Sequence, residues 1–190
     1  VKLKSIRYIL LVLLVTALLA ISFNGVASAQ VFFGYPARLV PVYSVDTEEN
    51  QVAISFDAAW GADKTEKIME VLKEYNCGAT FFLVGFWVDK YQDMTKMIDA
   101  NGFEIGTHSN THPDMTKLSK ESAKLELSTC VQMIENLTNK KVKLFRPPFG
   151  AYNNNVIEVS NELDLIPIQW SVDSLDWKGL SAKEITTRIV

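Results

Sequence analysis

The sequence predicts an α/β fold in which parallel strands alternate with helices, as an open sheet or closed into a barrel. Short apolar runs rich in β-branched and aromatic residues alternate with longer segments of helical periodicity between residues 51 and 190. Polar residues with reactive side chains follow several of these runs directly. Because the carboxyl ends of parallel strands meet at one edge, this edge is where we expect the functional groups.

The elements are predicted in order from the apolar patterns. The apolar runs predict strands over 52–56, 80–84, 103–105, 142–145 and 166–170. Helical spacing predicts helices that start near Asp63 with Glu66 in the first turn, and over 87–100, 119–138 and 155–163. Ser181 and Glu184 form a capping box that opens a last helix. No Gly, Asn or Pro ends this helix before Val190, so we expect C-terminal strands to be missing from this chain.

The N-terminal segment, residues 1–29, has the pattern of a signal peptide. Lys2, Lys4 and Arg7 precede an almost wholly apolar run over 8–23, and Ala27-Ser28-Ala29 resembles a cleavage site. An uncleaved membrane anchor is the alternative, although the run is shorter than a typical span of about 20 residues. In either case we expect the domain to be secreted, or attached to the cell wall or membrane on the outer face of the cytoplasmic membrane.

The remainder divides into a lead-in segment, 30–50, and one domain, 51–190. The net charge is −3, and loss of the three basic N-terminal residues changes it to about −6. An acidic exported domain is a poor nucleic-acid binder, so we expect no nucleic-acid partner, and membrane contact only through the N-terminal segment. The sequence carries no signal for the oligomeric state.

The two histidines of the chain are only four residues apart, at His108 and His112. Imidazole is the commonest protein ligand of catalytic divalent metals, and this spacing brings two rings to one ion. Gly106 and Pro113 bracket the pair in a loop that follows a short apolar run. The residues themselves leave two interpretations open, a metal site or a shaped turn without metal.

Three further strand ends carry charged residues. Asp57 follows the first apolar run, where a carboxylate is either a turn residue or a member of a cleft. Arg146 precedes two prolines, which hold it where it can pair with a carboxylate. Asp176 and Trp177 lie in a loop after the fifth run, and the indole belongs either to the core or to the wall of a sugar or acyl site.

Taken together and in order, these blocks resemble the first four motifs of the polysaccharide deacetylases, carbohydrate esterase family four. The resemblance covers about residues 50–190, and its exported form is similar to the sporulation-associated branch of that family. The matching blocks are Ser55-Phe56-Asp57, His108-Ser109-Asn110-Thr111-His112-Pro113, Arg146-Pro147-Pro148-Phe149-Gly150 and Asp173-Ser174-Leu175-Asp176-Trp177.

The resemblance implies a deformed (β/α) barrel and the hydrolytic removal of acetyl groups from a polymer such as peptidoglycan or chitin. It implies a divalent metal, zinc in the first place and cobalt or manganese otherwise, which activates water and polarises the acetyl carbonyl. By motif, the implied roles are metal ligands for His108 and His112, general base for Asp57, orientation of carboxylates for Arg146, oxyanion donor for the N–H of Phe149, tuning of the catalytic acid for Asp176 and acetyl-pocket wall for Trp177.

Two departures from the family pattern affect the predicted chemistry. Ala58 occupies the position of the aspartate that is the third metal ligand, so two histidines remain, with Asp114 and Asn110 as unranked substitutes. The chain also lacks a third histidine to act as the general acid for the leaving amine. We therefore expect a metal-dependent N-deacetylase that is poorly stable or inactive as this chain stands, and the alternative is a non-catalytic saccharide-binding domain of the same fold.

Overall fold

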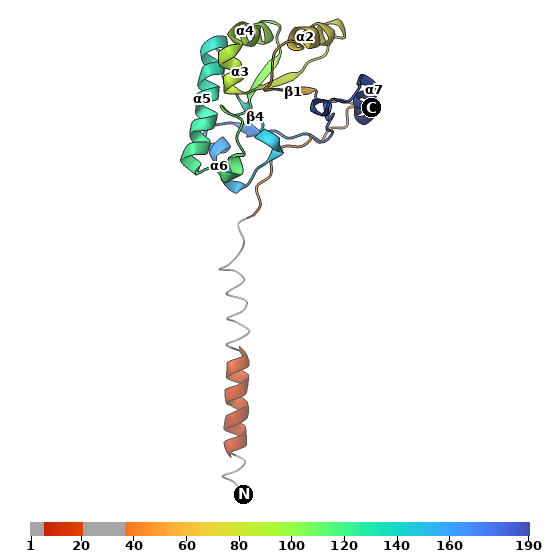
Figure 1. Ribbon diagram of the computed structural model, residues 1–190. Coiled ribbons are helices and arrows are strands. Elements are labelled where there is room, and N and C mark those ends of the chain that lie inside the picture. The colour runs from red at the N-terminus through yellow and green to blue at the C-terminus, as the bar shows by residue number, and fades with distance from the viewer. Residues whose placement is uncertain (1–5, 21–36) are drawn as a thin grey trace. The chain divides into compact units, whose positions relative to one another are not determined.

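The computed structural model describes residues 6–20 and 37–190, in two compact units, Val1–Arg38 and Leu39–Val190 (Figure 1). In the first unit, residues 6–20 are helical. Among the described residues, no helix has both the length and the apolar character that a membrane crossing requires. The expected cleavage site at Ala27-Ser28-Ala29 lies outside the described residues.

The second unit is a five-stranded parallel sheet with a helix in every connection between neighbouring strands. The strand order is β1-β2-β3-β4-β5, the same as the order along the chain. The elements are β1 (Ser55–Ala58), α2 (Thr65–Glu74), β2 (Thr80–Leu83), α3 (Gly85–Lys90), α4 (Gln92–Ala100), β3 (Glu104–Thr107), α5 (Lys120–Thr138), β4 (Leu144–Phe145), α6 (Asn154–Glu162), β5 (Ile166–Pro167) and α7 (Ala182–Ile189), with short 3₁₀ turns η1 (Met115–Lys117), η2 (Pro148–Gly150) and η3 (Asp176–Lys178).

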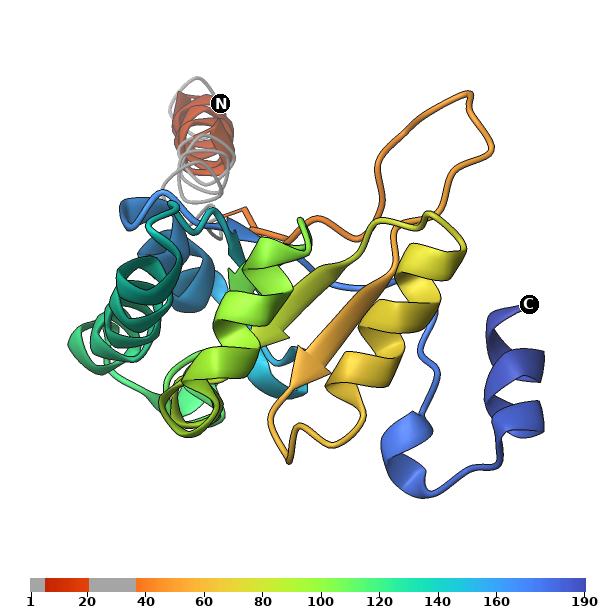
Figure 2. The same ribbon diagram turned by 90° about the horizontal axis from the view of Figure 1, so that it is seen from above.

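Sequential strand order determines where the helices lie. Parallel connections are right-handed, so strands added in one direction place their connecting helices on one face of the sheet, as in a barrel. Figures 1 and 2 show α2 to α5 along the strands on this outer side. The predicted α/β fold of the deformed-barrel type is therefore confirmed.

The alternation of side chains along the strands separates the core from the site. On β2, Phe81 and Leu83 lie in the hydrophobic core that the helices cover, whereas Phe82 points to the opposite, inner face. Gly106 of β3 lies beside Phe82, and a Cβ atom there would be 2.6 Å from the Phe82 ring. The inner face therefore requires a glycine at this position.

Three sequence-based boundaries are corrected by the structure. The first strand begins and ends later than predicted, so Asp57 lies within β1 rather than after it. The helix predicted over 87–100 is two helices, because Tyr91 adopts the non-helical angles φ −124° and ψ 51°. Asp63 does not cap α2, since the N-cap is Lys64 and Asp63 instead pairs with the Lys64 ammonium.

The two ends of this unit differ in how they join the sheet. Val42 of the expected lead-in segment pairs with Ile168 as an isolated parallel bridge, which places it beside β5. At the other end, the capping box of Ser181 and Glu184 is confirmed, but α7 contains no buried residue. The lead-in therefore contributes to the sheet, whereas α7 is held mainly by local contacts.

Candidate functional site at the carboxyl ends of the strands

Asp57 and Arg146 form the central ion pair of the site. Arg146 Nη1 donates to Asp57 Oδ1 at 2.8 Å, and Arg146 Nη2 donates to Ser55 Oγ at 2.8 Å. Ser55 and Asp57 are two residues apart on β1, so their side chains point to the same inner face. Arg146, which follows β4, thus binds two side chains of β1 and holds one oxygen of the Asp57 carboxylate in place.

The surroundings of Arg146 hold its guanidinium in one place. The side chain is only 5% exposed and lies over the Phe82 ring, with 4.1 Å between Cζ and the ring centroid. Arg146 Nη2 also donates to the carbonyl oxygen of Gln169 at 3.3 Å. The stacked ring and the three acceptors restrict the guanidinium to one orientation, so the Asp57 carboxylate that it binds is also held in place.

His108 follows β3 and is linked to the same pair of residues. Its Nδ1 donates to the carbonyl oxygen of Arg146 at 2.7 Å, and its Nε2 lies 3.7 Å from Asp57 Oδ2. Burial lowers the pKa of His108 below its usual range, although the charge of Asp57 opposes this effect. The ring is therefore neutral at neutral pH, with the Nε2 lone pair directed toward the carboxylate.

The loop that carries the second histidine is shaped by two left-handed residues, Ser109 at φ 67° and His112 at φ 59°. The buried hydroxyl of Ser109 accepts the backbone N–H of His112 at 3.0 Å. Gly85 at the start of α3 donates its N–H to the Ser109 carbonyl, and a Cβ atom at Gly85 would be 2.1 Å from Asn110 Oδ1. The close approach of α3 thus supports the turn that returns His112 to His108.

Glu126 of α5 also holds this loop, and it is absent from the residues selected from the sequence. Its carboxylate accepts the backbone N–H of Asn110 at 2.9 Å, the N–H of Thr111 at 2.8 Å and the Thr111 hydroxyl at 2.7 Å. A carboxylate next to the buried Leu127 is the signal that would have found it, because a charged group beside a core position requires a partner.

The histidine pair fits a divalent cation by two observations. The Nδ1–H group of His108 is used by the Arg146 carbonyl, so Nε2 is an acceptor, and it lies 3.7 Å from Oδ2 of Asp57, a second acceptor. The ring centroids of His108 and His112 are 4.9 Å apart. Two imidazoles that share a zinc ion through bonds of about 2.0–2.1 Å have centroids roughly 5 Å apart. Burial also lowers the pKa of His112, which leaves a nitrogen lone pair for the metal.

Among the described residues, none supplies the third metal ligand that the family pattern implies. Ala58 packs against the hydrophobic core and offers no donor. Asp114 caps η1, where it accepts from Thr116 and pairs with Lys117 at 3.1 Å. Over residues 6–20 and 37–190, no group of three His, Cys, Asp or Glu side chains is close enough to hold a metal ion. The residues present therefore fit an ion held by two protein nitrogens.

The remaining predicted site residues fall into two groups. Phe149 lies beside the pair, with its ring centroid 4.6 Å from that of His112 and a left-handed backbone at φ 60°. Asp176 and Trp177 lie on η3, where Asp176 accepts from Ser174 Oγ at 2.8 Å and Trp177 is 74% exposed. No contact among the described residues joins either of them to the histidines or Arg146, so their roles stay predictions.

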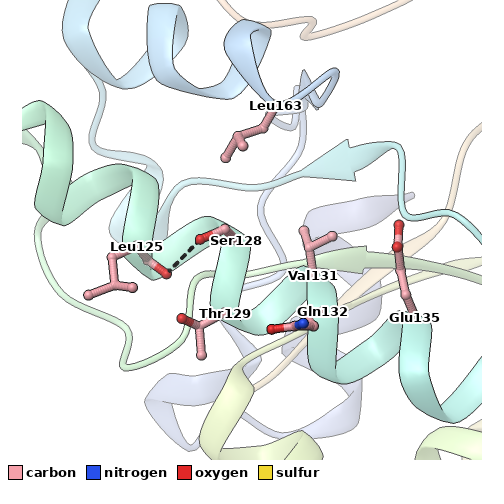
Figure 3. Close-up of a pocket in the computed structure, with 7 residues that line it drawn as sticks. All are labelled: Leu125, Ser128, Thr129, Val131, Gln132, Glu135 and Leu163. Carbon is pink, nitrogen blue, oxygen red and sulfur yellow. Dashed lines mark hydrogen bonds between the residues drawn. The ribbon is translucent and has the colours of Figure 1, made fainter.

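A surface cavity of about 460 Å³ lies along α5, away from this site (Figure 3). Its only ionisable side chain is Glu135, which already pairs with Lys141 at 2.7 Å and accepts the N–H of Val142. No predicted site residue contributes to it, so the cavity does not define the chemistry. The lining residues are Leu125, Ser128, Thr129, Val131, Gln132, Glu135 and Leu163.

Comparisons with known proteins identify the family of this chain. The family model for polysaccharide deacetylase matches residues 44–168. The peptidoglycan-N-acetylglucosamine deacetylase of Bacillus cereus is 31% identical over 158 residues, which are 83% of this chain and 58% of that protein. An uncharacterised protein of Bacillus subtilis is 34% identical over 79% of this chain and 47% of its own length. The chain thus spans about half the length of these curated relatives.

Solved structures include both catalytic and non-catalytic relatives. A CE4 family pseudoenzyme from Bacillus anthracis is 35% identical, with a TM-score of 0.77 over 79% of this chain and 53% of that one. A mutant of that pseudoenzyme with restored enzymatic activity matches with the same TM-score at 36% identity, over 79% of this chain and 55% of that one. From the family match and the geometry of the strand ends, we conclude that this chain belongs to the polysaccharide deacetylase family.

Proposed function

We propose that this domain is a hydrolase that removes acetyl groups from an N-acetylated cell-wall polysaccharide, of the peptidoglycan or chitin type. The observation that carries the proposal is the convergence of Asp57, His108, His112 and Arg146 at one edge of the sheet. This set combines a proton acceptor, a fixed cation and two neutral imidazoles, which hydrolysis needs and simple sugar binding does not. A curated relative named as a peptidoglycan deacetylase supports the choice of polymer.

In this proposal Asp57 is the general base. Arg146 occupies Oδ1, which leaves Oδ2 to accept the proton of the attacking water. The N–H of Phe149, next to His112, donates to the oxygen that becomes negative when water adds to the acetyl carbonyl. Because Arg146 and Phe149 flank Pro147 and Pro148, one rigid segment fixes the carboxylate and presents the oxyanion donor.

We propose that His108 and His112 hold a divalent metal, with zinc as the first choice and cobalt or manganese as alternatives. When bound, such an ion activates water and polarises the acetyl carbonyl. Three protein ligands are usual for catalytic zinc, so an ion held by two histidines is bound more weakly. The Nδ1–H bond from His108 to the Arg146 carbonyl orients the ring toward the metal position.

We further propose that the domain is exported and acts outside the cytoplasmic membrane, as in the sporulation-associated branch of the family. The support is the basic and apolar pattern of residues 1–29. An acetylated cell-wall glycan is found on that side of the membrane, so location and substrate agree.

A second candidate function is a non-catalytic saccharide-binding domain. It is favoured by the absence of a third ligand at Ala58 and by the similarity to a pseudoenzyme. This candidate predicts glycan binding that needs no metal and that Asp57→Asn does not change.

Acetate release distinguishes the two candidates. The full-length protein is incubated with N-acetylated peptidoglycan or chitin oligomers and with zinc, cobalt or manganese, and parallel samples contain a chelator. The deacetylase proposal predicts acetate release that requires metal and falls at least about 100-fold in Asp57→Asn. No acetate with any metal, together with intact glycan binding, would establish the binding function instead.

The variant Ala58→Asp tests the missing ligand directly. A carboxylate at this position adds the third ligand that the family pattern implies, so we expect zinc affinity to rise at least about tenfold. Ala59→Asp is the matched control, since it adds the same charge one residue later. If acetate is released only by Ala58→Asp, the natural chain is a binding domain.

A further inference from the structure

Four aromatic side chains form a continuous row across the carboxyl ends of the strands. The ring centroids of Phe86 and Trp60 are 5.4 Å apart, those of Trp60 and His112 are 6.1 Å apart, and those of His112 and Phe149 are 4.6 Å apart. The four residues follow β1, β2, β3 and β4, one from each connection. The row, Phe86-Trp60-His112-Phe149, therefore extends from the histidine pair in two directions.

Trp60 is the most exposed member of this row, and it is neither a predicted metal ligand nor a predicted oxyanion donor. Its side chain is 79% exposed, although a tryptophan ring is among the most costly groups to leave in water. It takes no part in the ion pair of Asp57 and Arg146, and it does not belong to the hydrophobic core. An exposed indole whose neighbours are a partly exposed Phe86 and a predicted metal ligand indicates a binding surface rather than a packing residue.

The loop that carries Trp60 is held in place by a hydrogen bond from α3. The buried indole N–H of Trp87 donates to the carbonyl oxygen of Gly61 at 2.6 Å. Gly61 has φ +73°, a left-handed conformation that turns the chain directly after Trp60. The tilted packing on Phe86 fixes the ring from the side. A ring presented in this way loses little side-chain entropy when a ligand stacks on it.

We propose that Trp60, supported by Phe86, is a stacking platform for a pyranose ring of the acetylated glycan, next to the sugar that lies at the histidines. The apolar face of a pyranose is uncharged and flat, and it matches an exposed indole. The position beside His112 places this ring one unit along the chain from the reacting acetyl group. The inference rests on the proposed function, since it takes its ligand from there.

The binding test uses the full-length protein with the substitution Asp57→Asn, so that hydrolysis does not consume the ligand. In Asp57→Asn, the affinity for N-acetylglucosamine oligomers of one, two and four units is measured by calorimetry. We expect Trp60→Ala to weaken binding of the tetramer about tenfold and of the monosaccharide less than about twofold, because a single sugar does not reach the platform. Trp60→Phe keeps an aromatic face and should remain within about threefold of the parent affinity.

A matched control removes another exposed aromatic ring. Tyr75, at the end of α2, is 69% exposed and lies outside the row, so Tyr75→Ala should leave the tetramer affinity unchanged. Equal losses in Trp60→Ala and Tyr75→Ala, or no loss in Trp60→Ala, would overturn the platform. A Trp60→Ala change that dissolves a dimer in ultracentrifugation and leaves glycan affinity intact would assign the ring to self-association and would also overturn it.

The kinetic readout separates this inference from the proposed function. With Asp57 intact, Trp60→Ala should raise KM for oligomers about tenfold with kcat nearly constant, since the platform binds ground state and transition state alike. If no variant releases acetate but the oligomer affinities follow the expected order, the deacetylase proposal fails and the platform stands. If acetate is released and neither KM nor affinity depends on Trp60, the platform alone fails.

Discussion

Two regions of this molecule carry family motifs but are held in different ways. The strand-end site, Asp57, His108, His112 and Arg146, is fixed by hydrogen bonds and ion pairs between residues up to 91 positions apart. The C-terminal segment, residues 171–190, is held mainly by contacts over two or three residues, such as Ser174 to Asp176 and Ser181 to Glu184. The parallel sheet positions the first region, and only local turn chemistry shapes the second.

This difference shows that a specific motif does not by itself establish a position in space. His108 and Arg146 come directly after β3 and β4, and their own backbone N–H groups donate to the carbonyl oxygens of Leu83 and Thr107 on the neighbouring strands, so backbone pairing sets their mutual distance. The motif with Asp176 lies on and before η3, beyond the end of β5 at Pro167, where the chain has left the sheet. The side chains of Asp176 and Trp177 are consequently exposed.

Hydrogen exchange should give the largest difference between the two regions. An eight-residue helix with no buried residue, such as α7, is marginally stable, whereas α5 buries Leu127 and Cys130 in the core. We expect amide protection in α7 to be at least about 100-fold lower than in α5, as measured by mass spectrometry on residues 1–190. Equal protection would show that α7 packs more tightly than its exposure indicates.

Replacement of Arg146 tests how much the contacts of the strand-end site contribute to the free energy of unfolding. Arg146→Met leaves the partly exposed Asp57 carboxylate without its cation and the Ser55 hydroxyl without its donor. We expect a loss of about 2–4 kcal/mol in the free energy of unfolding, below the full cost for a buried pair because Asp57 is one-third exposed. Urea denaturation measures the change. Arg188→Met in α7 is the control, with an expected change below about 0.5 kcal/mol, and similar losses in both variants would remove the distinction between the regions.

Glu126 provides a smaller test of the loop that carries His112. Glu126→Ala leaves two backbone N–H groups and the Thr111 hydroxyl without their acceptor, so we expect a loss of about 1–3 kcal/mol in the free energy of unfolding. Because the loop then fluctuates, zinc affinity should also fall, and both quantities are measurable by denaturation and calorimetry. Glu70→Ala, an exposed glutamate of α2, is the control. Retention of zinc affinity in Glu126→Ala would show that the loop keeps its shape without this carboxylate.

The histidines should give the site a pH dependence that the C-terminal segment lacks. Burial lowers the pKa of both His108 and His112 in the folded protein, so the unfolded chain binds protons first as the pH falls. The free energy of unfolding should therefore decrease as the pH is lowered through the ordinary histidine pKa of about 6.5. Denaturation at pH 7.5 and 5.5 with a chelator present measures this, and His108→Asn should reduce the slope. A stability that rises over this interval would contradict the direction of both shifts.

Much of the fold was predictable because it depends on local patterns. Short apolar runs placed the strands and helical spacing placed most helices, since both patterns reflect which side chains are buried. The split between α3 and α4 at Tyr91 was missed, because no Gly or Pro marks it and the break is a matter of backbone angles. The later start of β1 was missed for a related reason, since the ladder with β2 rather than apolar character sets its limits.

For the site, the sequence by itself determined which groups are present: two histidines, the Asp57 carboxylate, the Arg146 guanidinium, and an alanine where the family pattern implies a third metal ligand. The tertiary structure decided which of them meet. It joined Arg146 to Asp57 and Ser55, recruited Glu126, aligned Trp60 with His112, and left Asp176 and Trp177 at the surface. The reason is that side-chain chemistry is encoded residue by residue, whereas distances between strands depend on a ladder of hydrogen bonds between remote segments.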